Sequence, residues 1–70
     1  MVEEITIEIV GQPVGIEIGR SYDFVWHMGH ERTQSGRLVR LEAPFTLVVK
    51  AANGVLVRLS TRDLLNVVER

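Results

Sequence analysis

The stretch SGRLVRLEAPFTLVV, from Ser35 to Val49, carries the clearest indication of the fold of this chain. It holds two β-rich runs, RLVRLE and FTLVV, which are separated only by Ala43 and Pro44. Pro44 suits a sharp connection between two strands, because proline has no backbone N–H for a ladder and fixes its own φ. Gly36, at the head of the first run, permits a bend. The stretch therefore predicts two central strands, bent at Gly36 and sharply joined at EAPF.

Apolar and polar residues alternate on the N-terminal side of this stretch. EITIEIV and VGIEI each place their isoleucines or valine on one face, as a half-buried strand does. GQP lies between them and supplies turn residues, so residues 3–19 are predicted to form a β-hairpin. In SYDFVWHM, the residues Tyr22, Phe24, Trp26 and Met28 share one face. We interpret the aromatic ones as core, and a base-stacking platform is the alternative.

The remaining segments alternate between turns and strands. GHERTQSG is predicted to be a polar turn region, and Asn53-Gly54 a hairpin turn. VLVRLS and LLNVV are predicted strands, and STRD between them indicates one helical turn with Ser60 as its N-cap. Six or seven short strands in 70 residues cannot fill two sheets of ordinary size. We therefore predict a single all-β domain over residues 1–70, in the form of a small and strongly bent barrel. Closure of the barrel would remove most exposed strand edges.

The same residues resemble the Sm-like (LSm/Hfq-type) family over residues 22–68. In that family, a turn glycine and a second, strand-leading glycine are followed by two hydrophobes, an acid, a later hydrophobe and an asparagine. The matching positions are Gly29, Gly36, Leu38, Leu41, Glu42, Phe45 and, in the place of asparagine, Thr46. VLVRLSTRDLLNVV is similar to the second motif. The resemblance implies an Sm-like or SH3-like small barrel over residues 20–70, to which residues 3–19 add a hairpin.

The resemblance also implies a partner and a ligand. Sm-like proteins form rings by pairing the fourth strand of one subunit with the fifth strand of the next. Here these strands are Val55–Leu59 and Leu65–Val68, which makes a homo-oligomer with the interface residues Val55, Val57, Leu59, Leu65 and Val67 the expected state. The family site for RNA falls on Glu42, Phe45, Thr46, Ser60, Thr61 and Arg62. The alternative is that the extra hairpin covers these edges and keeps the chain monomeric.

Composition restricts the other classes of function. The chain has no cysteine, which excludes disulfides, thiolate metal sites and a cysteine nucleophile. It lacks a signal-peptide pattern and an apolar run of membrane-span length, so we expect a cytoplasmic protein. Net charge is −1, from −4 over residues 1–19 and +3 over residues 20–70. The basic residues Arg37, Arg40, Lys50, Arg58 and Arg62 would bind an anion if they converge, or else form a solvated or salt-bridged face.

No pattern indicates catalysis. The serines lack the spacing of a nucleophile elbow, and a barrel this small is filled by its own side chains. HMGHE could supply His27, His30 and Glu31 to zinc, but residues three apart on a strand face opposite sides. We therefore expect no metal and no cofactor. The predicted function is a non-catalytic module that self-assembles through strand edges and binds RNA. The alternatives are a protein-binding adaptor that uses β-augmentation, and a minimal oligomeric enzyme with its site at subunit junctions.

Overall fold

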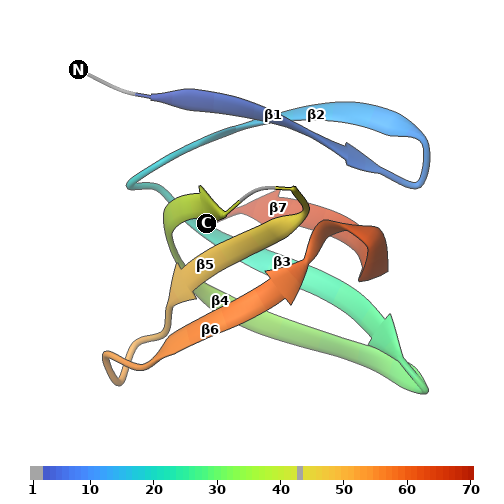
Figure 1. The fold of residues 1–70 in the computed structure, drawn as a ribbon. Coiled ribbons are helices and arrows are strands. Elements are labelled where there is room, and N and C mark those ends of the chain that lie inside the picture. The colour runs from blue at the N-terminus through green and yellow to red at the C-terminus, as the bar shows by residue number, and fades with distance from the viewer. Residues whose placement is uncertain (1–2, 43) are drawn as a thin grey trace.

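The computed structural model describes residues 3–42 and 44–70, which form seven strands and one 3₁₀ helix in two antiparallel sheets (Figure 1). The elements are β1 (Glu4–Ile9), β2 (Gln12–Glu17), β3 (Ser21–Met28), β4 (His30–Glu42), β5 (Thr46–Lys50), β6 (Leu56–Ser60), η1 (Thr61–Asp63) and β7 (Leu64–Glu69). The predicted all-β class is confirmed. Within the described ranges, no helix is long and apolar enough to cross a membrane.

The N-terminal hairpin is present, but its turn begins one residue before GQP and shares only Gly11 with it. β1 pairs with β2 from Glu4 opposite Glu17 to Ile9 opposite Gln12, which leaves Val10 and Gly11 as the turn. Their φ angles are 49° and 76°, and positive φ at both central residues is the signature of a type I′ turn. The prediction was wrong because a β-branched valine rarely adopts positive φ. Gln12 and Pro13 belong instead to β2.

The long strand β4 explains the opening stretch of sequence. Its first part, His30–Arg37, pairs with β3, and its second part, Arg37–Glu42, pairs with β5. The β4–β5 register shifts between Leu38 and Arg40, and such bulges bend a strand. The predicted sharp connection is confirmed, since β4 ends at Glu42 and β5 begins at Thr46. The bend was predicted at Gly36, whereas the irregularity lies between Leu38 and Arg40. Gly36 is needed instead for the close approach of β5, because a Cβ there would meet Val49 and Lys50. Pro44 lies in the β4–β5 connection, and Ala43 of EAPF falls outside the described residues.

The prediction of a polar turn region at GHERTQSG was wrong. Gly29 is the turn, with φ of 79°, and the residues after it begin β4 and pair with the outer half of β3. In Figure 1 this two-stranded ribbon projects from the rest of the sheet. Residues 27–33 are exposed, so neither face of the ribbon needs apolar side chains. The alternation that marks a half-buried strand is for that reason missing from its sequence.

The hairpin forms a second layer over the five-stranded sheet, whose strand order is β6-β5-β4-β3-β7 (Figure 1). Ile7, Ile9 and Ile16 of the hairpin pack into one core with seven residues of the sheet. Those seven are Tyr22, Phe24, Leu38, Leu47, Val49, Leu59 and Leu64. The aromatic pair Tyr22 and Phe24 is therefore core, as predicted, with ring centroids 5.8 Å apart in an edge-to-face arrangement.

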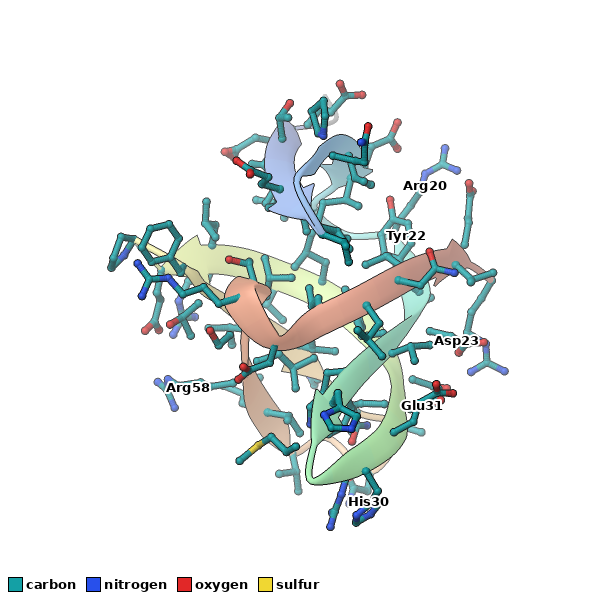
Figure 2. The ribbon with its side chains drawn as sticks, turned by 90° about the vertical axis from the view of Figure 1, so that its right-hand side faces the viewer. Arg20, Tyr22, Asp23, His30, Glu31 and Arg58 are labelled. Carbon is teal, nitrogen blue, oxygen red and sulfur yellow. The ribbon has the colours of Figure 1, made fainter. Side chains whose placement is uncertain are left out.

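The connection between hairpin and sheet is held by polar contacts. The backbone N–H of Glu17 donates to Tyr22 Oη at 2.9 Å, and Figure 2 shows the Tyr22 hydroxyl pointing toward the hairpin. After Gly19, the backbone of the linker pairs with Leu38 of β4: Gly19 N–H donates to Leu38 O at 2.8 Å, and Leu38 N–H donates to Arg20 O at 2.9 Å. Arg20 forms ion pairs with Glu17 and with Glu69 of β7.

The expected closed barrel is not what the strands form. Over the described residues, β6 pairs with β5 and β7 pairs with β3, and β6 and β7 share no ladder. The physical reason is that the hairpin supplies the apolar cover for the inner side of the bent sheet. Ile16, for example, is 1% exposed. Burial therefore does not require closure, and β6 and β7 each keep one side that pairs with no strand of residues 3–42 and 44–70.

Candidate functional site

The six residues expected at the RNA site lie together at one end of the central strands. Glu42 of β4 is opposite Thr46 of β5, and Thr46 is opposite Ser60 of β6. Directly opposite residues of an antiparallel ladder share a face of the sheet, so these three form one row. Phe45, Thr61 and Arg62 follow from the adjoining turn and from η1. In the sequence, the residues at 42–46 lie about 15 positions before those at 60–62. The β5–β6 ladder brings these two groups together.

The helical turn η1 is held against the β4–β5 connection. Ser60 is its N-cap, as predicted, and its hydroxyl accepts a hydrogen bond from the Arg62 N–H at 3.3 Å. The backbone N–H of Thr61 donates to Phe45 O at 2.7 Å. These two contacts place Arg62 over the ring of Phe45, with the guanidinium carbon 4.0 Å from the ring centroid. A cation at this distance from an aromatic face is attracted by the ring quadrupole.

Glu42 is already engaged by two arginines. Its Oε1 accepts from Arg40 Nη2 at 2.9 Å and lies 3.5 Å from Arg58 Nη2. These hydrogen bonds, that from Arg40 first, hold the pKa of Glu42 below its ordinary value. Any stability from this charge is present above the unfolded pKa and is lost as the pH falls through the folded pKa. Glu42 is therefore ionised at neutral pH, and its negative charge is offset by the guanidinium groups of Arg40 and Arg58.

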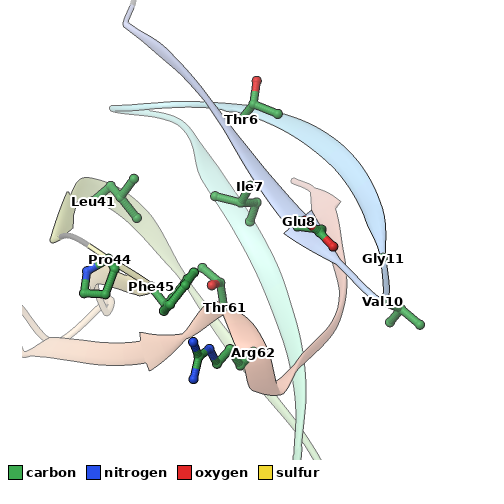
Figure 3. Close-up of a pocket in the computed structure, with 10 residues that line it drawn as sticks. All are labelled: Thr6, Ile7, Glu8, Val10, Gly11, Leu41, Pro44, Phe45, Thr61 and Arg62. Atoms are coloured by element: carbon green, nitrogen blue, oxygen red, sulfur yellow. The ribbon is translucent and has the colours of Figure 1, made fainter.

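A cavity of about 530 Å³ separates the Phe45–Arg62 pair from the hairpin (Figure 3). One wall consists of Thr6, Ile7, Glu8, Val10 and Gly11, and the other of Leu41, Pro44, Phe45, Thr61 and Arg62. Three of the expected site residues thus line it. The hairpin wall has no counterpart in the sequence prediction, because no local signal indicates which end of the sheet a hairpin will cover.

The expected interface residues divide into two groups. Val55 and Leu65 are exposed, whereas Leu59 is buried and Val57 and Val67 pack against the core of their own chain. Val55 directly precedes β6 and the other four lie on β6 and β7, which are the two edges of the five-stranded sheet. Two further apolar residues on these strands, Leu56 and Val68, are 45% and 48% exposed. The alternation of inward and outward residues along each strand could have identified them.

The histidines of HMGHE flank the turn at the tip of the projecting ribbon, where Figure 2 shows His30. His27 is opposite Glu31, and His30 is opposite Met28, so the two histidines face opposite sides of the ribbon. In the part of the chain that the structure describes, no group of three histidine or carboxylate side chains is placed to hold a metal ion.

The five basic residues considered for an anion site do not converge on one point. Arg40 and Arg58 flank Glu42, and Arg62 covers Phe45. Arg37 and Lys50 lie opposite each other at the other end of the β4–β5 ladder. None of these five pairs with the acidic hairpin among the described residues; Arg20 of the linker instead pairs with Glu17 of the hairpin and with Glu69 of β7. Comparisons with protein-family models, with curated proteins and with solved structures gave no match to this chain.

Proposed function

We propose that this chain is a non-catalytic interaction module that assembles head to tail, with β6 of one copy pairing with β7 of the next. The observation that carries the proposal is that both edges of the five-stranded sheet are free within the described residues. An edge strand offers a row of unpaired N–H and C=O groups to another chain. Exposed apolar side chains accompany both edges: Val55 and Leu56 at one, Leu65 and Val68 at the other.

Two further arguments support assembly. A chain of 70 residues without disulfides has a small core, and such chains commonly gain stability from a partner subunit. The strand order also puts the two strands that the Sm-like resemblance pairs between subunits at opposite edges of one sheet. Because the two edges differ, the contact is heterologous, and it gives a ring where the rotation closes. An Sm-like relationship of the core is part of this proposal.

Light scattering tests the assembly. We expect the wild-type chain to have a mass several times its 7.9 kDa. Replacing Leu65 and Val68 together with lysine should reduce the mass to that of one chain, because charged side chains on an edge oppose pairing. Met28→Lys is the matched control: Met28 is 66% exposed but lies at the ribbon tip, away from β6 and β7. A wild-type monomer would contradict self-assembly and favour an adaptor that binds another protein at the same edges.

The Phe45–Arg62 pair favours a second property, binding of single-stranded RNA. The Phe45 side chain is exposed enough to stack on a base, at 42%, and Arg62 beside it can pair with a phosphate. Thr46 and Ser60 add hydroxyl groups in the adjoining row. The Sm-like resemblance places the RNA site on the same residues.

Fluorescence anisotropy with short single-stranded RNAs tests this property. Affinity should fall steeply with salt, as it does when phosphates are neutralised by basic side chains. Phe45→Ala should weaken it about tenfold, because stacking on an aromatic side chain is worth about 1–3 kcal/mol per base. Met28→Ala, which removes an exposed side chain elsewhere, should leave the affinity unchanged. Binding that is absent, or that ignores both salt and Phe45→Ala, would exclude RNA as the ligand of this face.

A further inference from the structure

Two cations lie directly opposite each other on the outer face of the sheet. Arg37 of β4 is the register partner of Lys50 of β5, and it is also the partner of Ser21 of β3. The next pair inward along the ladder, Leu38 and Val49, is fully buried. Because successive residues of a strand alternate between faces, the side chains of Arg37 and Lys50 both project to the solvent side, in one row with Ser21.

This pairing runs against the usual rule for sheets, since like charges directly opposite each other destabilise a ladder. In the part of the chain that the structure describes, neither Arg37 nor Lys50 forms an ion pair with a carboxylate. The ion pairs present there are made by Arg20, Arg40, Arg58 and Arg70. Departures from a local rule are expected at functional sites. An anion bound between Arg37 and Lys50 would offset the repulsion between their two positive charges.

The neighbouring acid does not provide that balance. Asp23 lies opposite Ser35 in the β3–β4 ladder. Its Oδ1 accepts a hydrogen bond from Ser35 Oγ at 2.6 Å and lies 3.5 Å from Arg70 Nε. Asp23 thus offsets the charge of Arg70, and the charges of Arg37 and Lys50 remain.

The row borders a concavity of about 260 Å³. It is lined by Ser21, Ser35, Gly36, Arg37, Lys50, Ala51, Ala52 and Arg70. The small residues among these keep the floor open, while a guanidinium, an ammonium and the Ser21 hydroxyl offer donors. A guanidinium binds two oxygens of a phosphate side by side, and an ammonium adds a compact point charge.

We infer that this concavity is a binding site for a phosphoryl anion, held chiefly by Arg37 and Lys50. It is separate from the Phe45–Arg62 face, because the β4–β5 ladder runs from Glu42 and Thr46 at one end to Arg37 and Lys50 at the other. The inference stands on the charge pair and the concavity, and it does not depend on RNA binding.

Thermal unfolding with inorganic phosphate, against sodium chloride of equal ionic strength, tests the site. Phosphate at about ten times its Kd should raise the wild-type Tm by about 6–11 °C, because a ligand that binds the folded state stabilises it. Arg37→Gln and Lys50→Gln should each abolish the phosphate-dependent rise. Both side chains are exposed, so the variants should fold, and without phosphate they should be as stable as wild type or more stable. Arg32→Gln, an exposed arginine on the same strand outside the concavity, should keep the full rise.

A second arm uses an oligonucleotide without terminal phosphates in the Phe45→Ala background, to separate free phosphate from a phosphodiester. A rise with phosphate that Arg37→Gln removes identifies a free phosphoryl anion as ligand. A rise with the oligonucleotide alone, again removed by Arg37→Gln, identifies a phosphodiester, and both results support the site. No rise with either ligand, or an equal loss in Arg32→Gln and Arg37→Gln, would overturn it. Because Phe45→Ala does not touch the concavity, failure of the RNA proposal leaves this result unaffected.

Discussion

Replacing Phe24 with alanine should leave the chain largely unfolded at room temperature. Phe24 is fully buried at the centre of the core that the hairpin and the five-stranded sheet share. Truncation of a buried phenylalanine costs about 3–5 kcal/mol, from lost burial and from the cavity that remains. A domain of this size rarely has more than about 3–5 kcal/mol of total stability. The expected loss is therefore comparable with the whole free energy of unfolding.

Urea denaturation followed by circular dichroism measures this effect. Phe45→Ala serves as the matched control, because it removes the same side chain from an exposed position, where substitutions usually cost less than about 1 kcal/mol. Phe24→Ala should show no folded baseline at low urea, while Phe45→Ala should keep a cooperative transition. Equal midpoints for the two variants would contradict the shared core.

The second large effect is expected at Gly36, where even one methyl group has no space. A Cβ built there would lie 2.5 Å from Val49 Cγ1 and 2.7 Å from the backbone oxygen of Lys50. The backbone oxygen belongs to the neighbouring strand of the ladder and cannot rotate away, so Gly36→Ala must push β4 and β5 apart. Overpacking of this kind costs about 1–3 kcal/mol, and we expect the upper end of that range.

Gly15→Ala is the control for Gly36→Ala, because it adds the same methyl group to a strand. A Cβ at Gly15 would meet only the carboxylate end of Glu4, at 3.4 Å, and this flexible side chain can move. Gly36→Ala should lower the Tm by about 10 °C or more, and Gly15→Ala should change it little. If Gly36→Ala were as stable as wild type, the close approach of β4 to β5 at this point would be wrong.

The two-layer arrangement links stability to the proposed assembly. Ile7, Ile9 and Ile16 of the hairpin bury themselves on the same core that closure of a barrel would have covered. The five-stranded sheet can therefore remain open and keep β6 and β7 as edges. In this chain, the segment that the Sm-like resemblance does not explain is the one that allows the proposed interface to stay free.

Much of the local structure was predictable because its causes are local. The alternation in EITIEIV and VGIEI indicated the hairpin, and Ser60 indicated the cap of η1. Asn53-Gly54 indicated the turn before β6, where Gly54 has φ of 87°. The errors also have a physical cause. GHERTQSG predicts a turn rather than a strand because residues 30–33 are exposed, so this part of β4 needs no hydrophobic pattern.

The all-β class, the N-terminal hairpin and the short β4–β5 connection follow from the sequence alone, since turn chemistry and period-two alternation act within a few residues. That the sheet does not close into a barrel depends instead on how the layers pack in three dimensions. The tertiary structure likewise decided which apolar residues at the edges are exposed, that Arg62 covers Phe45, and that Arg37 faces Lys50. These features depend on ladder register and on the side of the sheet that the hairpin covers. Both the register of the strands and the side of the sheet that the hairpin covers are set by burial of the whole core. No short stretch of sequence encodes that burial.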